Sequence, residues 1–117
     1  MTERHPRWVY EAGDEPDPRF SLANERTFLA WVRTALALLA GGVALHALNL
    51  PETTWVRTML AVLLVVLGGL VTLLAMVRWA RVERAMRTRS PLPAFSLGYL
   101  LTGAVVVGAL LLAVAFL

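Results

Sequence analysis

The residues best able to do chemistry in this chain are two arginines at the start of an apolar stretch. Arg26 and Arg33 are seven positions apart, which is about two turns of an α-helix, so their side chains lie on one face. A guanidinium group keeps its proton, so at membrane depth Arg33 must reach the surface, pair with an acid or face a polar cavity. This pattern favours anion binding, because rings of arginine select anions in membrane pores.

Two interpretations of Arg33 follow from the sequence. Its side chain can snorkel to the headgroups, because it lies roughly 10 Å along the helix from Arg26. It can instead point between helices, because small residues let helix backbones approach closely in lipid. The small residues of the same helical stripe are Ala30, Ala37, Ala40, Gly41 and Ala44.

Two polar residues, Asn24 and Glu25, come directly before Arg26. We expect Glu25 to pair with Arg78 or Arg81 and so to join the first long helix to the second. Alternatively, Glu25 tunes an anion path by competing for these arginines. Both polar residues are therefore predicted to form an entrance region or a contact between helices.

The densest charge in the chain follows the second apolar stretch. It consists of Arg78, Arg81, Arg84, Arg87 and Arg89, with Glu83 as the acid among them. Such an excess is typical of cytoplasmic loops whatever the protein does. The functional interpretation is a vestibule that attracts anions or acidic headgroups, each arginine contributing on the order of 1 kcal/mol near the surface.

Other site chemistry is poorly supported by the sequence. The chain has no cysteine, and its two histidines, His5 and His46, have no companions with which to form a metal site. A hydrolase or transferase needs a nucleophile with a base, paired carboxylates or a metal. We therefore predict no enzymatic activity, no cofactor, no metal site and no nucleic-acid partner, and we interpret His46 as an interfacial polar residue.

The elements that position these residues are membrane helices. The chain is 58% hydrophobic and 16% charged, and its apolar residues occur in blocks, as expected of an integral membrane protein. No charged residue occurs in 58–77 or in 90–117. We predict an all-α protein with transmembrane helices at about 27–49, 56–79 and 94–117, which form one domain over 19–117.

Residues 1–18 are predicted to be a cytoplasmic tail, either flexible or folded onto the membrane surface. The acids in the first twenty residues and the lack of an apolar core predict no signal peptide. Asp17 or Ser21 can cap the helix that follows. The arginines of the tail and of the 78–89 segment place both on the cytoplasmic side. The C-terminus is then expected on the opposite side of the inner (plasma) membrane, which the chain crosses several times.

The segment around the first arginine also resembles a known family. Asp17-Pro18-Arg19, followed by the run Leu-Ala-Asn-Glu-Arg-Thr-Phe-Leu-Ala-Trp-Val-Arg-Thr at 22–34, resembles the signature of the YidH-like bacterial inner-membrane proteins, a domain of unknown function (202). The signature is also similar to the membrane domain of the eukaryotic vacuolar transporter chaperone complex, whose channel takes up polyphosphate. This resemblance implies a homo-oligomer, with a pentamer as the suggested number of copies. It also implies that Arg26 and Arg33 face a pore.

Two hypotheses of function follow. In the first, copies assemble around an axis and their arginines conduct or bind an anion of the polyphosphate type. In the second, the chain is a non-conducting structural or regulatory membrane subunit that binds a partner or anionic lipid. Polyphosphate synthesis is not implied, because the polymerase domain of the chaperone complex has no counterpart here.

Overall fold

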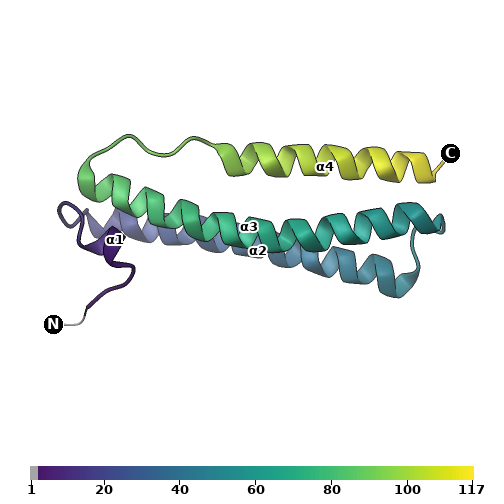
Figure 1. The fold of residues 1–117 in the computed structure, drawn as a ribbon, viewed down its shortest axis with the longest axis horizontal. Helices are drawn as coiled ribbons and strands as arrows, with labels where there is room; N and C mark the ends of the chain where they lie inside the picture. The colour runs from purple at the N-terminus through teal and green to yellow at the C-terminus, as the bar shows by residue number, and fades with distance from the viewer. Residues whose placement is uncertain (1–2) are drawn as a thin grey trace.

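The structure is a computed structural model that describes residues 3–117, and helices joined by loops are the regular secondary structure over that range. A short helix, α1 (Arg7–Tyr10), precedes three long ones, α2 (Pro18–Leu48), α3 (Thr54–Thr88) and α4 (Ser96–Ala115). The three long helices run side by side along the longest axis of the molecule (Figure 1). Each is long and apolar enough to cross a membrane. The predicted fold class and the predicted number of membrane helices are therefore confirmed.

Helix α2 begins and ends at residues suited to those positions. The side chain of Asp17 accepts a hydrogen bond of 2.9 Å from the backbone N–H of Arg19, and Pro18 occupies the first turn. Asp17, rather than Ser21, is thus the N-terminal cap. At the other end Asn49 has φ 56°, a left-handed conformation that asparagine tolerates and that commonly ends helices.

Helices α2 and α3 form an antiparallel pair that packs through glycines. A Cβ added at Gly42 would lie 3.0 Å from the Ala61 carbonyl oxygen, and one added at Gly68 would lie 3.0 Å from the Ala35 carbonyl oxygen. Each glycine therefore lets the two backbones come close together, as small residues do between membrane helices. The buried core cluster beside this contact comprises Ala35, Leu67, Val71, Ala75 and Leu97.

Helix α4 lies mainly on α3 and joins the core at its first turns. Leu97 is buried, and the side chains of Trp31, Leu100 and Leu101 pack against the same core cluster. Beyond this contact α4 is largely exposed, as expected for a helix surrounded by lipid or by another protein chain.

The two longest helices exceed the thickness of a bilayer. At 1.5 Å per residue, α2 and α3 are about 46 and 52 Å long, whereas the hydrocarbon core is about 30 Å thick. Both therefore continue beyond the spans expected from the sequence, at the end where the N-terminal tail and the α3–α4 connection lie (Figure 1). We call this the basic end. The C-terminus lies at the other end, and the assignment of the basic end to the cytoplasm remains a prediction.

Candidate anion-binding site

A buried polar network joins α2 to α3 at the basic end. The amide nitrogen of Asn24 donates hydrogen bonds to the Trp79 carbonyl oxygen at 3.0 Å and to Glu83 Oε1 at 3.3 Å. The hydroxyl of Ser21 donates to Glu83 Oε2 at 3.2 Å. Asn24 and Glu83 are only 4% and 3% exposed. Because a buried carboxylate must be hydrogen-bonded, these bonds fix the register of the two helices.

The acid that joins the two helices is thus Glu83. Glu25, which we expected to pair with Arg78 or Arg81, is exposed and forms no ion pair within residues 3–117. The predicted pair between Glu25 and Arg78 or Arg81 is therefore not formed within one described chain. The sequence signal for Glu83 was its position as a single acid among the arginines of 78–89.

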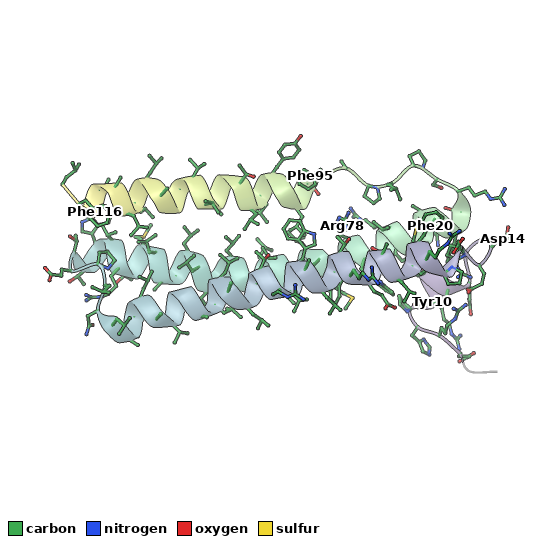
Figure 2. The ribbon with its side chains drawn as sticks, turned by 180° about the vertical axis from the view of Figure 1, so that it is seen from behind. Tyr10, Asp14, Phe20, Arg78, Phe95 and Phe116 are labelled. Atoms are coloured by element: carbon green, nitrogen blue, oxygen red, sulfur yellow. The ribbon has the colours of Figure 1, made fainter. Side chains whose placement is uncertain are left out.

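The N-terminal tail is held against α3 by Arg87, which is 7% exposed. Its guanidinium donates to the carbonyl oxygens of Ala12 at 2.8 Å and Tyr10 at 2.7 Å, and to Glu15 Oε1 at 2.6 Å. The tail is therefore folded onto a helix, rather than onto the membrane surface or free as expected. Figure 2 shows Tyr10 and Asp14 at this end of the molecule.

A second arginine of the cluster also holds the tail. Arg84 donates to the Trp8 carbonyl oxygen at 2.5 Å and lies 5.0 Å from the centre of the Trp8 ring. Cation–π contacts of this kind add to the attraction. Arg84 and Arg87 therefore both take part in holding the tail, and Arg87 uses three of its nitrogen atoms to do so.

The carboxylate of Glu15 forms ion pairs with two arginines, Arg4 and Arg87. The guanidinium of Arg4, followed by that of Arg87, lowers the pKa of the Glu15 carboxyl from 4.5 to about 2. Burial raises the pKa of the Tyr10 phenol. Glu15 is thus ionised at neutral pH and bridges two arginines from distant parts of the chain.

Arg26 and Arg33 lie on the face of α2 that is turned away from α3. Each is two residues, or about 200° of helical rotation, from a residue buried against α3, namely Asn24 and Ala35. Both arginines are exposed, and neither forms an ion pair with any described residue. The structure therefore brings them onto one outward face but does not enclose them between the helices of one chain.

The two predicted arginines on α3 are placed differently. Arg78 is half-buried and Arg81 is exposed. Figure 2 shows Arg78 near the level of Phe95, next to which α4 begins. Both lie at the basic end with Arg26, whereas Arg33 lies about 10 Å deeper. The predicted site residues are therefore distributed over α2 and α3 and do not form a single pocket.

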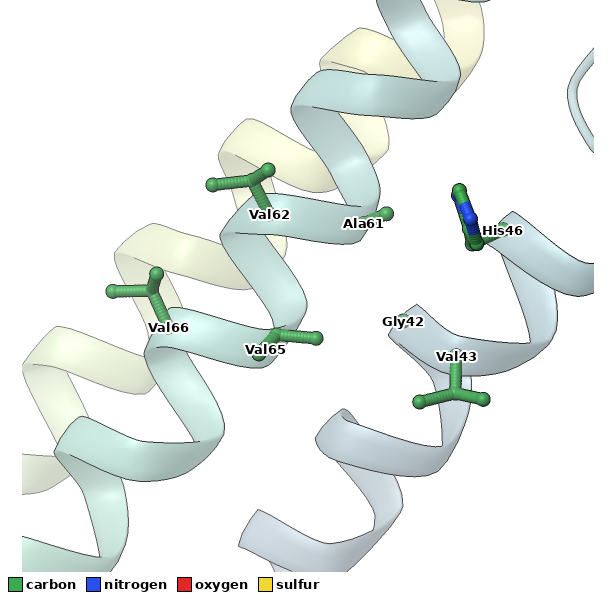
Figure 3. Close-up of a pocket in the computed structure, with 7 residues that line it drawn as sticks. All are labelled: Gly42, Val43, His46, Ala61, Val62, Val65 and Val66. Atoms are coloured by element: carbon green, nitrogen blue, oxygen red, sulfur yellow. The ribbon is translucent and has the colours of Figure 1, made fainter.

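His46 lines an apolar groove at the opposite end of the molecule. Figure 3 shows its ring between α2 and α3, next to Ala61. The groove has a volume of about 450 Å³, and its other lining residues are Gly42, Val43, Ala61, Val62, Val65 and Val66. No group of three or more His, Cys, Asp or Glu side chains able to hold a metal occurs within residues 3–117.

Comparison with known proteins identifies the family of this chain. Residues 19–85, which include the Asn24–Glu83 network, match the family described as Domain of unknown function (DUF202). An uncharacterized protein of Mycobacterium tuberculosis (strain H37Rv) is 52% identical over 102 residues, which cover 85% of this chain and 83% of the relative. The inner membrane protein YidH of Escherichia coli (strain K12) is 49% identical over 87 residues, which cover 73% of this chain and 75% of YidH. No solved structure matches the chain. With three membrane-crossing helices and this inner-membrane relative, the chain is a multi-pass inner-membrane protein that belongs to the YidH-like DUF202 family.

Proposed function

We propose that copies of this chain assemble around an axis in the membrane and that their outward arginine faces bind and conduct a polyanion. The protein then acts as a conduit and not as an enzyme. The similarity of the 17–34 segment to the membrane domain of the vacuolar transporter chaperone complex suggests a polyphosphate-type chain as the anion. Arg33 is the selecting group, and Arg26, Arg78 and Arg81 attract the anion at the basic end.

The observation that carries this proposal is the position of Arg33. It is exposed on the face of α2 opposite α3, beyond the start of the predicted span, and no acid of the described chain neutralises it. A charge at this depth is costly against lipid and is therefore placed where a polar cavity or partner receives it. In a ring of copies, each Arg33 reaches a shared central space, where the positive fields add.

A second function is favoured by the reach of the same side chain. An arginine about two turns inside the predicted span can extend toward the headgroups and bind the phosphate of an anionic lipid. In that case the arginine face anchors a non-conducting structural or regulatory subunit. The two proposals differ in whether anions cross the membrane.

Anion flux separates the two functions. The purified chain is reconstituted into liposomes loaded with short-chain polyphosphate or chloride, and efflux is measured for the wild type, Arg33→Ala and Arg33→Lys. Conduction predicts flux in the wild type, loss in Arg33→Ala with the oligomer intact, and retention of much of the flux in Arg33→Lys. Arg57→Ala, which changes an arginine at the other end of the molecule, is the matched control.

Three outcomes would favour the non-conducting subunit. The first is no anion flux in the wild type, and the second is flux that Arg33→Ala leaves unchanged. The third is dissociation of the oligomer in Arg33→Ala, because the arginine then serves assembly and not passage.

A further inference from the structure

Two grooves of opposite character lie on the two flanks of α2 at the basic end. The acidic groove, between α2 and α3, has a volume of about 290 Å³ and is lined by Glu25, Phe28, Leu29, Met76 and Trp79. The basic groove, between α2 and α4, has a volume of about 430 Å³ and is lined by Arg26, Thr27, Ala30, Trp31, Thr34 and Leu101. Neither Glu25 nor Arg26 forms an ion pair within residues 3–117.

The acidic groove has the composition of a receptor for an arginine side chain. Leu29 and Met76 offer an apolar surface on which the aliphatic stem of an arginine can lie. The ring of Trp79 attracts a guanidinium through its π-face. The carboxylate of Glu25 completes the site as an acceptor for a charge-assisted hydrogen bond.

Sequence adjacency makes a second copy of the chain the matching partner. Glu25 and Arg26 are successive residues on one helix, so they differ in depth by only about 1.5 Å and in direction by about 100°. In two copies that share one membrane orientation, the acid of one flank and the arginine of the other are therefore at the same level. A contact between two different flanks of identical chains is heterologous and can close into a ring.

We propose that Arg26 of one copy occupies the acidic groove of its neighbour and pairs with Glu25 there. This inference rests on the assembly of copies proposed above. It assigns Glu25 and Arg26 to the contact between copies, and it leaves Arg33, about 10 Å deeper along α2, available to the central space. With Arg26 paired in the contact, Arg78 and Arg81 attract the anion at the basic end. It also explains why Glu25 finds no partner on α3 of its own chain.

Charge exchange tests the contact in the full chain, purified in mild detergent, with the oligomer measured by sedimentation or native mass spectrometry. Glu25→Arg and Arg26→Glu each place like charges at the contact, and we expect association weaker by roughly fivefold per contact. The double variant E25R/R26E restores opposite charges and should recover most of the association. Glu52→Arg, an exposed acid at the other end, is the control and should have no effect.

Cross-linking provides a second test that depends only on proximity. The chain has no cysteine, so Leu29→Cys and Ala30→Cys, one on each flank, can be made singly, tagged differently and mixed in membranes. We expect disulfides chiefly between the two variants, with few in either variant alone. Abundant Leu29→Cys homodimers would show a symmetric contact and would overturn the proposal.

The outcomes also separate this inference from the proposed function. An oligomeric wild type whose association E25R/R26E fails to recover overturns the Glu25–Arg26 contact alone. A monomeric wild type at all protein concentrations overturns both. Recovered association without anion flux supports the contact and removes only conduction.

Discussion

Arg87 gives the sharpest test of how the tail is held. Replacing it with methionine keeps an apolar stem but removes the guanidinium that binds the carbonyl oxygens of Ala12 and Tyr10. Hydrogen bonds to charged groups contribute about 1.5 to 3 kcal/mol each. The exposed Glu15 pair is left out because solvent screens it. Two such bonds at the low end of this range amount to about 3 kcal/mol, so we expect docking of the tail to weaken by about 100-fold.

Hydrogen exchange measures this loss directly. The amide of Asp14 donates to the Arg87 carbonyl oxygen at 3.0 Å, so in the docked tail it is protected and serves as the reporter. In Arg87→Met we expect its exchange to accelerate by about 100-fold, or to the rate of an unfolded chain if docking is weaker than that. Amides in the middle of α2 and α3 should keep their protection, because the membrane part does not depend on the tail.

A second variant keeps this reasoning falsifiable. Gly13 has φ +49°, and a Cβ added there would collide with the Arg87 carbonyl oxygen, so Gly13→Ala should release the tail with the guanidinium still present. Arg81→Met removes an exposed arginine that does not contact the tail and should change nothing. Unchanged exchange at Asp14 in Arg87→Met would refute the clamp.

Three further predictions follow from the described contacts. Gly68→Ala should weaken the α2–α3 pair by about 1 to 3 kcal/mol through overpacking, whereas Gly69→Ala, whose Cβ meets nothing within 4 Å, should not, as measured by unfolding in mixed micelles. Asn24→Ala takes a donor from the buried Glu83 and should cost about 2 kcal/mol; adding Glu83→Gln removes the charge and should recover part of this in a double-mutant cycle. The pKa of Glu15 is lowered from 4.5 to about 2. Its contribution to docking of the tail is therefore fully present above about pH 4.5 and is lost as the pH falls through about 2. Tail exchange in Glu15→Gln should therefore lack the acid dependence of the wild type.

Much of the fold could be predicted because long apolar stretches without charge identify membrane helices. The uncharged stretches 58–77 and 90–117 fixed two spans, and the Asp17-Pro18 pair marked the start of α2 within a few residues. The ends of α2 and α3 beyond the bilayer were not predicted, since polar helix and polar loop have similar composition outside the hydrocarbon. Their length is decided by contacts with each other and with the tail.

The site was harder to predict because it depends on which polar groups meet across helices. Helical spacing correctly placed Arg26 and Arg33 on one face, since that relation is local. The choice of Glu83 over Glu25 as the acid that joins α2 to α3 depends on the rotation of the two helices about their axes, which is set by the glycine contacts at Gly42 and Gly68. Sequence periodicity within either helix alone contains no such information.

There is a physical reason why some arginines hold the tail whereas Arg33 has no ion-pair partner among the described residues. Arg84 and Arg87 lie beyond the predicted span of α3, where backbone carbonyl oxygens of the tail accept hydrogen bonds from them, so both contribute to the fold. Arg33 lies on the face of α2 opposite α3, and it forms no ion pair within residues 3–117. A charge that the monomer cannot neutralise must be satisfied by lipid, by a neighbouring copy or by an anion. The unmet charge of Arg33, rather than the larger arginine cluster, is therefore where a function beyond folding has to be sought.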